Sequence, residues 1–202
     1  MNTTIALKPI TLEKVKKMSA EKLKEVLAET YSDTDGKMTM ISSVDQKRHE
    51  VLKEFLSSAS GCPYDDIILI ALDYPLLWDA VVSNHNVGYT EQNRRVIEQV
   101  ILPKVRLVAN KMRAQVRPHL KQLLKSLLDP RKQNVRFLSL MQIFSIADAY
   151  LEAGEKEEIM GGIIQHQHFT TDVLRLMIDD IGRDHITDTN FLQGVLLKYL
   201  RR

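Results

Sequence analysis

Apolar residues recur every three or four positions along most of this chain, which is the spacing of one face of an α-helix. The pattern is clearest between residues 104 and 128, where it predicts a stripe that faces the core. The stripe consists of Val105, Val108, Ala109, Met112, Val116, Leu120, Leu123 and Leu127. Pro118 interrupts the pattern, and its missing N–H predicts a kink or break near Arg117. We therefore expect separate helices at about 91–102, 104–117 and 119–128.

The same spacing predicts helices on both sides of this segment. Ser19 is a suitable N-cap for a helix that buries Leu23 and Leu27. A capping box at residues 43–46 opens a second helix, which we expect to reach about residue 58. After the central segment, the pattern predicts two helices separated by a turn at Gly154. Two more helices follow toward the C-terminus.

One apolar run is ambiguous. Residues 67–72 fit either a buried strand or a helix, and periodicity alone does not distinguish the two. The chain contains no second run of similar quality with which a strand could pair, so we expect a helix. Pro75 is expected to begin the next helix, which contains the only tryptophan, Trp78. We expect that side chain to lie in the core.

These elements predict an all-α fold, a compact bundle of about nine helices with short polar connectors. Residues 1–10 are polar and are expected to form an N-terminal arm. Residues 11–202 are expected to form a single helical domain. A soft boundary near residues 87–89 leaves open an arrangement of two tightly joined helical halves.

Composition supports a globular protein in a reducing compartment. Apolar residues make up 44% of the 202 residues, enough for a sizeable core. The single cysteine, Cys62, excludes an intrachain disulfide framework. No apolar run approaches the roughly 20 residues of a membrane span, and the N-terminus lacks the layout of a secretory signal. We expect a cytoplasmic location, in the protein's own cell or in a host cell.

Charge is unevenly distributed along the chain. Between Arg94 and Arg136 twelve Lys or Arg stand against two acidic residues, Glu98 and Asp129, in a chain whose overall net charge is only +2. Three interpretations are open: binding of an acidic partner, pairing with the acidic segment 56–93 within one chain or between copies, or a solvated face. The candidate partner-binding residues are Arg106, Arg113, Arg117, Lys121, Lys125, Arg131 and Lys132.

The leading hypothesis is a non-catalytic helical interaction protein, an adaptor, assembly or structural subunit that binds an acidic protein or another copy of itself. The alternative is a nucleic-acid-binding protein that contacts phosphates through the same helices. Residues 94–136 contain no Phe, Tyr or Trp, so a stacking platform for single strands is absent. Phosphate contacts to a duplex need no such platform.

No catalytic or cofactor motif is present. His166, His168 and His185 make a small metal-dependent hydrolase a third hypothesis, but no cysteine or His-Glu-x-x-His pattern accompanies them. Cys62 precedes a proline at an expected helix start, and nothing in the local sequence supplies it with a base. The chain contains no phosphate-binding glycine loop. We therefore expect no enzyme activity, no metal and no cofactor.

Overall fold

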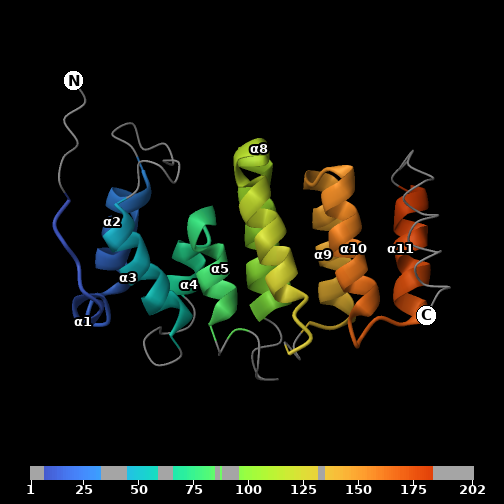
Figure 1. The fold of residues 1–202 in the computed structure, drawn as a ribbon, viewed down its shortest axis with the longest axis horizontal. Coiled ribbons are helices and arrows are strands. Elements are labelled where there is room, and N and C mark those ends of the chain that lie inside the picture. The colour runs from blue at the N-terminus through green and yellow to red at the C-terminus, as the bar shows by residue number, and fades with distance from the viewer. Residues whose placement is uncertain are drawn as a thin grey trace. The chain divides into compact units, whose positions relative to one another are not determined.

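The computed structural model describes residues 7–32, 45–58, 66–84, 87, 96–131 and 135–183. The chain divides into two compact units, residues 1–85 and 86–202, and Figure 1 shows the helices of each. Every regular element within the described ranges is helical, so the predicted all-α class is confirmed. Within those ranges no helix is both long enough and apolar enough to cross a bilayer.

The described residues of the first unit form six short elements. They are α1 (Leu12–Val15), α2 (Ala20–Tyr31), α3 (Gln46–Ser57), α4 (Asp66–Ala71), the 3₁₀ helix η2 (Pro75–Leu77) and α5 (Trp78–Ser83). Thr11 caps α1, and Ser19 caps α2 by accepting a hydrogen bond from the backbone N–H of Lys22 at 3.3 Å. As predicted, Leu23 and Leu27 are buried.

The rest of this unit confirms two predictions and corrects a third. Residues 66–71 are helical, and Trp78 is fully buried with its indole N–H donating to the carbonyl of Leu72 at 2.8 Å. The N-cap of α3 is Asp45, whose carboxylate accepts from the N–H of Arg48 at 3.1 Å. The predicted capping box is wrong, because the helix begins at Gln46 itself.

The second unit contains longer helices. They are the π-helix η4 (Ile97–Ile101), α8 (Leu102–Leu127), α9 (Phe137–Tyr150), α10 (Ala153–Gln165) and α11 (Thr171–Arg183). Helices α9 and α10 lie side by side and are joined by only two residues (Figure 1). Both also contact α8.

Helix α8 forms the centre of this unit's core. Its predicted stripe is buried apart from Met112, which is half-buried, and Val105, Ala109, Val116 and Leu120 are fully inaccessible. The break predicted at Pro118 is wrong, because α8 is helical from residue 102 to residue 127 across the proline. Pro118 is exposed and lies between the buried side chains of Val116 and Leu120. Packing of the stripe on both sides of the proline therefore compensates for the hydrogen bond that it removes.

The turn predicted at Gly154 is also misplaced. The chain turns at Leu151 and Glu152, and Gly154 lies in the first turn of α10. Glu152 is the N-cap, and the carboxylate of Glu155 accepts from its backbone N–H at 3.2 Å. This capping interaction begins the helix before the glycine is reached. The predicted N-terminal arm up to residue 6, Cys62 and the final helix lie outside the described residues.

Candidate interaction surface on helix α8

The cations in the second half of α8 are paired within the chain. Arg117, Lys121 and Lys125 follow one another at intervals of four residues, so they share one side of the helix. Arg117 forms an ion pair with Glu152, and its Nε lies 3.4 Å from a carboxylate oxygen of Glu155. These carboxylates belong to the start of α10 and not to the acidic segment 56–93.

Glu158 of α10 accepts the next two cations. The Nζ of Lys121 lies 2.6 Å from one of its carboxylate oxygens, and the Nζ of Lys125 lies 2.5 Å from the other. Hydrogen bonds from Lys121 and then from Lys125 lower the pKa of Glu158 to about 2. The same contact raises the pKa of Lys121. Glu158 and Lys121 are therefore both charged at neutral pH. Across the cluster, three cations (Arg117, Lys121 and Lys125) face three carboxylates (Glu152, Glu155 and Glu158).

Two of the cations predicted to bind a partner, Arg131 and Lys132, follow the end of α8. Arg131 follows the helix and pairs with Asp129 two residues earlier, its Nη2 lying 2.6 Å from the carboxylate. Lys132 lies outside the described residues, as does the side chain of Arg113 within α8. The structure thus places Arg117, Lys121 and Lys125 together, with Arg131 in a separate turn.

Arg106, in the first half of α8, has a different environment. Its side chain is exposed and makes no ion pair or hydrogen bond with the residues that the structure describes. The neighbouring helix is α9, whose only acidic residue, Asp148, binds the Nζ of Lys156 at 2.8 Å. Lys111 is likewise exposed and unpaired within the described part of the chain. Arg106 therefore keeps an uncompensated charge.

A cavity of about 130 Å³ lies beside Arg106. Its lining comes from α8 and α9 and consists of Leu102, Pro103, Arg106, Gln142 and Ile146. The side-chain amide of Gln142 donates to the backbone carbonyl of Glu98 at 3.1 Å, whereas its buried Oε1 has no hydrogen-bond partner among the described residues. The cavity thus combines apolar walls with a cation that is unpaired within the described part of the chain.

Two large apolar side chains are exposed on the helices that form this cavity. Leu107 of α8 is 59% exposed and lies one helical turn after Pro103. Leu138 of α9 is 56% exposed and lies one turn before Gln142. Exposed leucines are common when they are isolated. These two, however, each lie one turn from a residue that lines the cavity.

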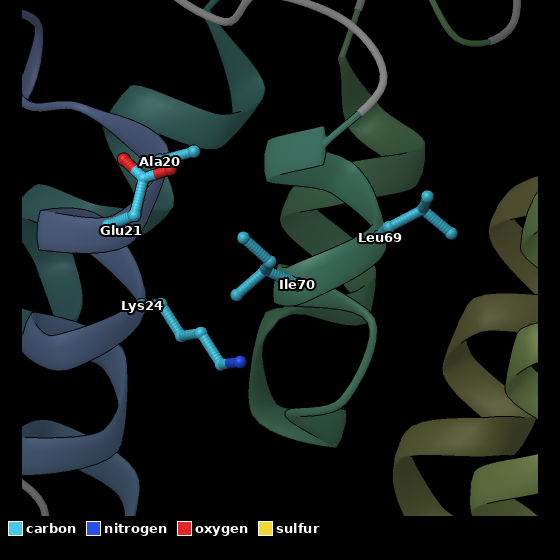
Figure 2. A pocket seen from close by; sticks show the side chains of 5 residues that line it. All are labelled: Ala20, Glu21, Lys24, Leu69 and Ile70. Atoms are coloured by element: carbon cyan, nitrogen blue, oxygen red, sulfur yellow. The ribbon is translucent and has the colours of Figure 1, made fainter.

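The first unit contains a broader hollow between α2 and α4, of about 390 Å³. Figure 2 shows Lys24 extending from α2 toward α4, Ile70 pointing back toward α2, and Leu69 pointing away. Glu21 also lines the hollow, and its pKa is lowered by its own backbone N–H and by the Ser19 hydroxyl. This carboxylate therefore contributes to the cap of α2 and is a poor general base.

A polar cluster is buried in the same unit between α2 and α3. The guanidinium of Arg48 is almost inaccessible and donates to Glu29 at 3.2 Å, while its Nε and Nη1 have no partner. The hydroxyl of Tyr31 lies 2.8 Å from the Nδ1 of His49. Burial raises the pKa of Tyr31, so its hydroxyl stays protonated at neutral pH. These contacts join α2 to α3.

The histidines of the metal hypothesis are only partly described. The rings of His166 and His168 are 5.6 Å apart after the end of α10, and burial lowers the pKa of His166. His185 lies outside the described residues. In the part of the chain that is described, no group of three or more His, Cys, Asp or Glu side chains could hold a metal ion.

Sequence reasoning missed the residues that divide the cations into two groups. These residues are the acids that α10 supplies and, on α9, Gln142 and Ile146. One pattern pointed to the pairing: cations at every fourth residue of α8 match Glu155 and Glu158, three residues apart on a later helix. The pattern becomes informative only if α8 and α10 are already known to be neighbours.

Within the described residues, fold and site together define an all-α protein with a cluster of paired cations and an unpaired arginine beside a mainly apolar cavity. No protein-family model, curated protein or solved structure matches this chain.

Proposed function

We propose that this protein is a non-catalytic helical interaction protein that binds an acidic segment of another protein through the first half of α8. The observation that supports this proposal is Arg106, an exposed arginine with no carboxylate partner among the described residues, next to a cavity. Of the seven cations predicted to bind a partner, Arg106 is the one with a described side chain and no internal pairing.

Electrostatics favours this half of the helix. A partner carboxylate that approaches Lys121 or Lys125 must compete with Glu158, which already binds both ammonium groups. Arg106 imposes no such competition, and its planar guanidinium can bind both oxygens of a carboxylate at once. Lys111, five residues further along and about 140° around the helix, adds a second charge that is unpaired among the described residues. Both charges would also increase the rate of encounter with an acidic partner.

A matched pair of double variants tests this proposal. R106Q/K111Q removes two cations that are unpaired among the described residues, and K121Q/K125Q removes two paired ones, with the same change in net charge. Each protein is used to capture partners from its native context after RNase and DNase treatment, and captured proteins are quantified by mass spectrometry. Circular dichroism verifies that both variants are folded. We expect capture by the wild type and by K121Q/K125Q, and loss of capture by R106Q/K111Q.

Other outcomes would contradict the proposal. Capture that persists in R106Q/K111Q would show that Arg106 and Lys111 are not the binding surface. Capture that disappears after nuclease treatment would favour the nucleic-acid alternative, in which binding also falls steeply with salt.

A further inference from the structure

The geometry points to the chemistry of the bound segment: one aliphatic side chain enters the cavity between α8 and α9, and a carboxylate one to four residues away pairs with Arg106. This inference rests on the proposed function and specifies its ligand. The cavity is lined by Leu102, Pro103 and Ile146 on its apolar side and by Arg106 and Gln142 on its polar side.

The size of the cavity suits a single side chain. Its volume is about 130 Å³, whereas a water molecule occupies about 30 Å³ and an apolar cavity of about 150 Å³ accommodates benzene. Leucine, isoleucine, valine or methionine fits these limits, and a tryptophan indole exceeds them. Three of the five lining residues are apolar, so a polar side chain would lose its hydration without gaining partners.

Charge determines the second feature of the segment. Arg106 is the only charged residue that lines this cavity, and it is exposed and unpaired within the described residues. A carboxylate near the inserted side chain would complete its hydrogen bonding. Gln142 adds a polar side chain to the lining, and its amide already donates to the backbone carbonyl of Glu98. The guanidinium of Arg106 therefore favours an acidic peptide over a simple hydrocarbon ligand.

The surroundings indicate a protein partner of some length. Leu107 and Leu138 extend apolar surface beyond the cavity, one along α8 and one along α9. A segment that spans both helices would cover these leucines while its anchor side chain occupies the cavity. In protein interfaces, buried anchor side chains are usually surrounded by contacts that exclude water from them.

Selection from a library of random twelve-residue peptides displayed on phage, with the full chain as bait, tests this inference. We expect enriched sequences in which an aliphatic residue lies one to four positions from Asp or Glu. In a synthetic peptide of the enriched sequence, replacing the aliphatic residue by alanine should weaken binding by roughly ten- to a hundredfold, measured by fluorescence anisotropy.

Two variants of the chain identify which residues contact the peptide. R106E should replace Asp or Glu by Lys or Arg in the enriched sequences. I146A enlarges the cavity and should shift the aliphatic position toward Phe or Met. Because Ile146 is buried, I146A is used only if circular dichroism matches the wild type, and R106E, at an exposed position, provides the second readout.

The possible failures are distinguishable. Acidic sequences without a fixed aliphatic position would overturn the cavity inference and leave the proposed function intact. Absence of enrichment, or enrichment that R106E does not change, would overturn both. Concentration-dependent dimerisation that is lost in R106E would place a second copy of this chain on the surface and overturn the peptide assignment.

Discussion

The two halves of α8 carry cations at similar density but differ in what lies beside them. The first half contacts α9, whose single carboxylate is bound by Lys156. Residues of the second half contact α10, which supplies Glu152, Glu155 and Glu158 to Arg117, Lys121 and Lys125. Arg106 and Lys111 in the first half thus have no partner among the described residues, whereas Arg117, Lys121 and Lys125 in the second half are paired.

A high density of cations in the sequence therefore does not mean that all of these cations are available to a partner. A net charge of +10 over residues 94–136 suggests an extensive basic face, yet three of its cations pair with acids from outside that window. Exposed ion pairs contribute little to stability. Under the proposed function, their main consequence would be to direct an acidic partner toward Arg106 and away from the second half of the helix.

The largest expected effect tests whether packing or charge holds α8 in place. Leu120 is fully buried and Lys121, its neighbour, is in the ion pair with Glu158. Leu120→Ala should lower the free energy of unfolding by about 2–5 kcal/mol, because it leaves a cavity in the core. Lys121→Ala should have a much smaller effect, because its ion pair is open to water. Urea unfolding followed by circular dichroism measures the free energy of unfolding of both variants. Similar decreases in the two variants would mean that the ion pairs hold α8 against α10.

Only some features of α8 could be predicted from the sequence. Burial of Leu120, Val116 and Val105 follows from helical spacing, because periodicity reports directly on which face is apolar. Continuity of α8 through Pro118 does not follow, because local propensity favours a break. Packing on both sides of the proline keeps the helix continuous, and this packing cannot be predicted from the local sequence.

The candidate site was predictable only in part. The basic character of Arg106 and Lys121 is evident from the sequence, but their different availability depends on residues far away in the chain. Lys125 and Glu158 are separated by 33 positions and Arg117 and Glu152 by 35. Such contacts depend on how helices pack, and the cavity formed by Pro103 with residues of α9 depends on the same packing.

An effect of intermediate size on the free energy of unfolding is expected where α10 approaches the end of α8. Gly161 and Gly162 are adjacent in α10, and each replacement by alanine should gain about 0.8–1 kcal/mol of helix propensity. A Cβ at Gly161 meets nothing within 4 Å, whereas one at Gly162 would lie 3.0 Å from the Cδ1 of Leu128. Gly161→Ala should therefore stabilise by about 1 kcal/mol, and Gly162→Ala should gain less or destabilise.

Urea unfolding of the two alanine variants measures the difference between their free energies of unfolding. A third variant, Gly162→Leu, places a larger side chain against Leu128. The larger side chain should destabilise by about 1–3 kcal/mol through overpacking. Equal gains for Gly161→Ala and Gly162→Ala would show that Leu128 moves aside freely, and α10 would then be held less closely than the ion pairs of Lys121 and Lys125 suggest.

The smallest expected effect comes from a substitution that releases the paired cations in the second half of α8. Glu158 binds Lys121 and Lys125, whereas Glu157 is exposed and unpaired among the described residues. E157Q and E158Q change the net charge equally, but only E158Q releases two cations. If both then contact phosphates of a short DNA duplex, the salt dependence of binding should steepen by up to about 1.8 in log–log slope for E158Q, and much less for E157Q. Fluorescence anisotropy over a range of salt concentrations measures the slopes. Equal slopes would mean that Glu158 does not restrict these cations, and compensation by α10 would no longer explain why Arg106 is the available residue.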